Sequence, residues 1–134
     1  GHLPQEKLLE FHERFTSEAP PIRDAMWLDT AMHLFIVEHS GNRFLIDMMR
    51  RVFEENLRII ISSRQNEAEI HDARAEHAAI LEMLIAGQID AAALAMFDHL
   101  CHCEQAALEF FYNSSARSAI PIMYHASMEQ IYSQ

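Results

Sequence analysis

Apolar residues recur along the chain at the three- and four-residue spacing of one helix face. Leu8, Phe11 and Phe15 share one side of the first such segment, and later segments repeat the pattern over greater lengths. The pattern predicts helices at residues 5–16, 22–39, 42–64, 67–86, 90–113 and 117–132. Because the breaks between them are short, the chain is expected to form an all-α antiparallel bundle of about six helices.

Proline and glycine mark most of the breaks. Pro20 and Pro21 separate the first two predicted helices, since proline lacks an amide hydrogen and disfavours helix in the residue before it. The run Ser40-Gly41-Asn42 should end one helix and start the next, with the glycine in the left-handed conformation of a helix C-terminus. Gly87 ends the fourth helix, and Asp90 is expected to cap the fifth by accepting from free amides of its first turn.

Composition favours a single domain over residues 1–134. Half of the residues are apolar and 22% are charged, so the chain can bury a core. No apolar run is long enough to span a bilayer, and no signal peptide opens the chain, so we expect no membrane partner. The formal net charge is −10 and the basic residues are scattered, which argues against nucleic-acid binding by this chain alone.

The cysteines and histidines bear on location and chemistry. Cys101 and Cys103 would point about 200° apart on a helix, so a disulfide between them is implausible. Reduced thiols are typical of a cytoplasmic protein, and we expect that location. Nine histidines beside ten Lys and Arg residues are unusual, and they prompt a search for metal ligands.

Asp29 and His33 project from one helix face, one turn apart. They lie on an apolar stripe with Met26, Ile36 and Val37 that should face a core. A buried unpaired carboxylate is costly, and a bound cation is one of the few partners that suffice. The alternative is an Asp–His hydrogen bond within one helix.

His77 and His99 each lie in the middle of an otherwise apolar stripe, where either alone is explained by a hydrogen-bonded core histidine. Together with Asp29 and His33, they supply three imidazoles and one carboxylate from three helices. Metal sites in helix bundles are built in this way, which predicts a metal site with these four ligands. The donor set suits Zn²⁺ or Ni²⁺, with Mn²⁺ and Fe²⁺ as alternatives.

A series of motifs in this order and spacing resembles the FCD domain, the C-terminal effector-binding domain of FadR-type transcription regulators in the GntR superfamily. The matching motifs are Asp29-x3-His33, Ser40-Gly41-Asn42, Glu76-His77-Ala78-Ala79-Ile80-Leu81, Ala86-Gly87-x-x-Asp90 and Met96-x2-His99-Leu100. The resemblance implies a helical bundle with a central metal-bearing cavity, in which Asp29, His33, His77 and His99 hold the ion. It further implies a small organic acid as effector, a homodimer, and DNA binding through an N-terminal winged helix-turn-helix.

Two features depart from the family pattern. No winged-helix segment is present, and the Arg-x2-Leu-Glu character of the family's usual first helix is not evident before Pro4. The chain is therefore expected to be an excised piece of a regulator or a stand-alone relative.

An anionic effector also needs a cationic or amide donor, and we expect Arg58 and Asn56 of the third predicted helix to supply it. The alternative is that Arg58 is a solvated surface residue. We do not expect an enzyme, because no general base stands out beside the four ligands. The competing interpretations are a stand-alone helical metalloprotein, either a hydrolytic enzyme or a bundle around a structural metal ion.

Overall fold

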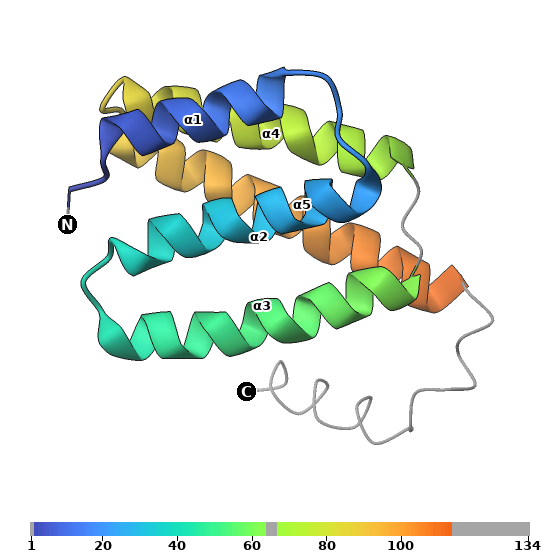
Figure 1. The fold of residues 1–134 in the computed structure, drawn as a ribbon. Coiled ribbons are helices and arrows are strands. Elements are labelled where there is room, and N and C mark those ends of the chain that lie inside the picture. Colours follow the sequence, from blue (N-terminus) through green and yellow to red (C-terminus); the bar gives the residue numbers. More distant parts are fainter. Residues whose placement is uncertain (1, 64–66, 114–134) are drawn as a thin grey trace. The chain divides into compact units, whose positions relative to one another are not determined.

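The computed structural model describes residues 2–63 and 67–113, and over these ranges it contains helices and no strand (Figure 1). The helices are α1 (Gln5–Thr16), α2 (Ile22–Glu38), α3 (Arg43–Ser63), α4 (Glu67–Ile85) and α5 (Ile89–Asn113). The all-α prediction is confirmed, and the first five predicted helices are present with closely similar bounds. The sixth predicted helix, residues 117–132, lies outside the described residues.

Contacts divide the chain into two compact units, Gly1–His99 and Leu100–Gln134. The first unit holds α1 to α4 and the beginning of α5, residues 89–99. The described part of the second unit is the remainder of α5. The features described below belong to the first unit.

The turn between α2 and α3 follows the chemistry expected of Ser40-Gly41-Asn42. Gly41 has a φ of 71°, the left-handed conformation that residues with a Cβ rarely adopt. The Asn42 side-chain oxygen accepts the amide of Leu45 at 3.1 Å and so caps α3. The Ser40 hydroxyl oxygen accepts the amide of Asn42 at 3.2 Å, which closes the turn.

The turn between α4 and α5 is only partly as predicted. Gly87 has a φ of 72°, and the Gln88 amide donates to the Met83 carbonyl at 2.9 Å, as in a glycine-terminated helix. The capping role predicted for Asp90 is wrong, because α5 begins at Ile89 and Asp90 lies within its first turn. The Gln88 carbonyl accepts the Ala92 amide instead, while the Asp90 carboxylate is well placed for the positive end of the helix dipole.

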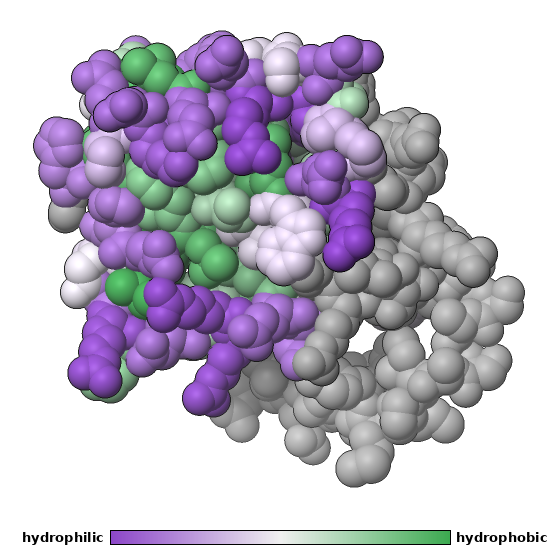
Figure 2. All heavy atoms as spheres, viewed as in Figure 1, coloured by the Kyte–Doolittle hydropathy of each residue, from purple (hydrophilic) through white to green (hydrophobic). Residues whose placement is uncertain are grey.

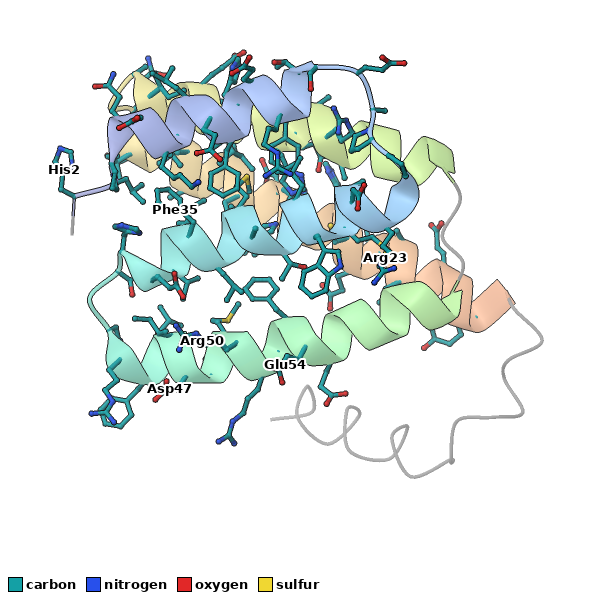
Figure 3. The ribbon with its side chains drawn as sticks, viewed as in Figure 1. His2, Arg23, Phe35, Asp47, Arg50 and Glu54 are labelled. Carbon is teal, nitrogen blue, oxygen red and sulfur yellow. The ribbon has the colours of Figure 1, made fainter. Side chains whose placement is uncertain are left out.

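In the first unit α1 runs antiparallel to α4, and α2 runs antiparallel to α3 (Figure 1). The α2 helix also packs against α4, and the core forms where α1, α2 and α4 meet. Phe35 of α2 packs against this core, with its ring centroid 5.4 Å from that of Phe11 (Figure 3). The buried core residues are Leu8, Phe11, Phe15, Leu28, Met32 and Leu81.

A buried arginine joins α4 to the end of α1. Arg74 is 6% exposed, and its Nη2 donates to the carbonyls of Arg14, Phe15 and Ser17 at 3.2, 2.8 and 3.0 Å. The last carbonyls of a helix have no partner within the helix, and they carry its partial negative charge. The guanidinium therefore caps α1 and fixes its end against the α4 turn that leads to His77.

Polar side chains border this face of the molecule, and apolar side chains gather in a band between them (Figure 2). Arg50, which lies on the side of α3 toward α2, donates to Glu38 across the two helices at 2.7 Å (Figure 3). Among residues 2–63 and 67–113, no helix is both long and apolar enough to cross a bilayer.

Candidate metal centre

The α2 helix supplies two neighbouring side chains to the centre of the first unit. His33 is 7% exposed, and the side chain of Asp29, one turn earlier, is 35% exposed. The Asp29 Oδ1 lies 3.7 Å from the His33 Nε2. Leu28 and Met32, each adjacent to one of them, are buried in the core and fix this face of α2 inward.

The α4 helix places His77 beside both of these groups. His77 is 1% exposed, and its Nε2 lies 3.1 Å from the His33 Nε2 and 3.1 Å from the Asp29 Oδ1. Ile80 and Leu81, one turn later in α4, are buried and hold this face of the helix against the core. A histidine and a carboxylate from α2 therefore meet a histidine from α4.

The α5 helix completes the cluster with His99, which is 2% exposed. Its Nε2 lies 3.0 Å from the His77 Nε2, and its Nδ1 lies 2.6 Å from the Oε2 of Glu76. One donor atom from each of Asp29, His33, His77 and His99 lies within 4.8 Å of the other three. The structure thus brings all four predicted ligands together, and this cluster could bind a metal ion.

Burial controls the charge on these groups. It lowers the pKa of His33 to about 4 and that of His77 to about 2, and repulsion from the neighbouring histidines adds to both shifts. It raises the pKa of Asp29 to about 6, against the opposing attraction of His99. At neutral pH both imidazoles are therefore uncharged, as metal ligation requires, and Asp29 is ionised.

Protons alone cannot satisfy this cluster. His99 donates from Nδ1 to the Glu76 carboxylate, so in the neutral ring its Nε2 carries a lone pair. His77 can share a proton on Nε2 with only one of its neighbours there, His33, His99 or Asp29. The Nδ1 of His77 is buried and has no hydrogen-bond partner among the described residues. A cation, in contrast, accepts electron pairs from all four donors at once.

The spacing of the donor atoms also fits a metal ion. Ligand atoms held 2.0–2.1 Å from a four-coordinate zinc ion lie roughly 3.3 Å from one another. Four of the six separations between donor atoms, 3.0, 3.1, 3.1 and 3.7 Å, lie close to that value, and all six lie within 4.8 Å. Aromatic rings flank the cluster: Phe15 lies 4.9 Å from His77 and Phe53 lies 5.5 Å from His33, measured between ring centroids.

The residues predicted to bind an effector belong to α3, but the side chains of Asn56 and Arg58 lie outside the described part of the structure. Their role stays a prediction. Two contributors near the centre were not assigned a role from sequence: Glu76, beside His99, and the buried Arg74, one turn before His77 on α4. Glu76 stood within a recognised motif, but nothing in the sequence pointed to its partner on another helix.

A comparison with protein families matches the FCD domain model to residues 5–102, which contain the whole cluster. The chain belongs to the FCD family. The FCD domain is the effector-binding domain of GntR-type transcription regulators and is a regulatory ligand-binding domain. The match begins well before Asp29, so the family resemblance is confirmed over more of the chain than the motifs spanned. Comparison with curated proteins and with solved structures finds no match.

Proposed function

We propose that this FCD domain is a metal-dependent sensor of a small organic acid within a GntR/FadR-type regulator. The observation that supports it is the convergence of Asp29, His33, His77 and His99 within 4.8 Å in a buried centre. Three imidazole nitrogens and one carboxylate oxygen favour a borderline divalent ion, Zn²⁺ or Ni²⁺, with Mn²⁺ and Fe²⁺ as alternatives. The family match supports the sensing role, because the domain is one that binds effectors.

The charges around the centre favour an anionic effector. A divalent ion together with Arg74 contributes three positive charges, while Asp29 and Glu76 contribute two negative ones. Arg74 is 6% exposed and the Asp29 and Glu76 side chains are 35% and 33% exposed, so solvent screens the remaining positive charge only in part and the charge attracts an anion. When bound, the ion supplies a Lewis-acidic position that a carboxylate oxygen of the effector can occupy.

Access to the centre favours the side on which Asp29 lies. Its side chain is 35% exposed, whereas the three histidines are 1 to 7% exposed. Binding there would favour one arrangement of α2, α4 and α5, and a DNA-binding domain of the same regulator would respond through that linkage. We expect this domain to act as a homodimer.

The test is calorimetry with purified full-length chain whose metal content has been measured by elemental analysis. Zinc-loaded and chelated protein are titrated with a panel of dicarboxylates and hydroxycarboxylates. We expect heat of binding from at least one acid with the loaded protein, and none with the chelated protein or with His77→Ala. His12→Ala is the matched control, because His12 pairs with Glu82 on the surface of α1 and α4, away from the centre.

The outcomes separate the interpretations. Tight zinc binding without a response to any carboxylate would remove the sensor and favour a structural ion. Failure of the unmodified chain to bind zinc, nickel, manganese or iron would remove the metal dependence altogether. Hydrolysis of an ester or phosphoester that His77→Ala abolishes would instead favour the enzyme interpretation.

A further inference from the structure

Glu76 and His77 are consecutive residues of α4, yet their side chains serve different partners. His77 lies at the centre of the cluster, whereas the Glu76 Oε2 lies 2.6 Å from the Nδ1 of His99 on α5. Successive side chains project about 100° apart around a helix, so a pair of neighbours can approach both edges of a ring that lies between them. The imidazole of His99 is held in this way, with Nε2 toward His77 and Nδ1 toward Glu76.

The contact fixes the tautomer of His99. An ionised carboxylate can only accept hydrogen bonds, so the proton of the neutral ring resides on Nδ1. The lone pair is then on Nε2, the atom 3.0 Å from the His77 Nε2. The negative charge of Glu76 also increases the electron density that Nε2 can donate to a cation.

The three histidines are therefore not equivalent. His77 has no hydrogen-bond partner for its Nδ1 among the described residues, and its tautomer is set by the cluster alone. His99 has a charged partner at short distance, with the Glu76 side chain 33% exposed and that of His99 2% exposed. Such a short contact with a charged acceptor in a largely buried position restricts rotation of the ring.

We propose that Glu76 is a positioning residue for the metal ligand His99: it sets the tautomer and the orientation of this imidazole and strengthens its bond to the ion. This inference rests on the proposed metal-dependent function. Outer carboxylate partners of this kind change metal affinity by about 10- to 100-fold when they are replaced. The ligand that α5 contributes thus depends on a side chain of α4.

The experiment compares Glu76→Gln and Glu76→Leu with the unmodified full chain. Gln keeps an oxygen that can accept from Nδ1 but loses the charge, and Leu removes both. The matched control is Glu82→Gln on the same helix, because Glu82 also pairs with a histidine, His12, but on the surface. Two properties are measured: zinc affinity by competition with a chelator of known affinity, and the His99 tautomer in chelated protein from long-range proton–nitrogen spectra.

We expect the Nδ1–H tautomer of His99 in the unmodified chain, and a mixture of tautomers in Glu76→Leu. Zinc affinity should fall by about 10-fold in Glu76→Gln and by up to about 100-fold in Glu76→Leu, with Glu82→Gln unchanged. Unchanged zinc affinity in both Glu76 variants would overturn the proposal. It would do so even if the chelated variants were less stable, because a loss of stability without a loss of zinc affinity indicates a purely structural contact. Failure of the unmodified chain to bind zinc would instead overturn the proposed function on which the inference depends.

Discussion

Replacing Asp29 with Asn should change the free energy of unfolding in opposite directions in the absence and presence of zinc. Without metal, the ionised carboxylate is desolvated beside three imidazoles, and it destabilises the folded chain. With a metal ion in the proposed centre, the same carboxylate would be a ligand. The neutral amide of Asn removes the unfavourable charge but also weakens the binding of the ion.

The size of the first effect follows from the pKa of Asp29, which burial raises from 3.8 to about 6. A shift of roughly two units corresponds to about 3 kcal/mol. Because the side chain is 35% exposed, solvent screening reduces the effect to about 1–2 kcal/mol. The folded carboxyl group binds its proton more tightly than the unfolded one, so its stabilising contribution is complete below about pH 4 and is lost as the pH rises through about 6.

Urea denaturation at about pH 8, followed by circular dichroism, measures both effects. In chelator, Asp29→Asn should be more stable than the unmodified chain by about 1–2 kcal/mol, with the difference shrinking as the pH falls toward 4. With zinc at about a thousand times its Kd, the unmodified chain gains about 4 kcal/mol, and the variant gains much less. Asp47→Asn is the control, since Asp47 is 60% exposed and its pairing with Arg43 is loose at 4.0 Å. A variant less stable than the unmodified chain in chelator at pH 8, or an equal gain from zinc in both, would refute this reasoning.

Two further predictions concern buried charge. Arg74→Met should lower the free energy of unfolding of chelated protein by about 2–4 kcal/mol, because one buried and two partly buried hydrogen bonds from a charged donor are lost. Arg50→Met, at a 54% exposed side chain, should leave the free energy of unfolding nearly unchanged, and equal losses in the two urea titrations would contradict the capping role of Arg74. In chelator, the chain should become less stable as the pH falls from about 6.5 toward 4, because His33 and His77 bind protons in the unfolded chain at a higher pH than in the folded chain. Protonation of Asp29 in the folded chain below about pH 6 offsets part of this loss. The pH dependence of the melting temperature should therefore be weaker in a His33→Gln/His77→Gln double variant, and identical profiles would contradict the assigned pKa shifts.

The helices could be predicted because their ends are set by local chemistry. Pro20 and Pro21 interrupt a helix, and Gly41 and Gly87 adopt the positive φ that ends one. These effects act on the backbone within a few residues, so the positions of proline and glycine in the sequence predict them directly. The predicted cap at Asp90 was wrong, although that prediction also rested on local chemistry. Asp is a good capping residue, but the turn at Gly87 closes with the Gln88 amide donating to the Met83 carbonyl, and the helix starts at Ile89, leaving Asp90 inside the first turn.

Sequence spacing could predict the parts of the site that lie on one helix, but not the contacts between helices. Asp29 and His33 could be paired from their spacing alone, because four residues make one helical turn. His77 and His99 could be recognised as polar residues on apolar stripes, but their convergence on α2 depends on how the helices pack. The partnership of Glu76 with His99 could not be predicted, since no regular spacing relates side chains on two different helices.

The contacts around His77 connect the cluster to α1. The Phe15 ring lies 4.9 Å from the His77 ring, and the Phe15 carbonyl accepts from Arg74, one turn before His77 on α4. Any reorientation of the His77 ring must therefore be accommodated by Phe15 of α1, whose main-chain carbonyl is already hydrogen-bonded to Arg74 of α4. Close-packed interiors transmit such changes, because neighbouring side chains have little free volume into which they can relax. If an ion and an effector bind at this centre, the end of α1 and the ligand-bearing turn of α4 should consequently shift together rather than separately.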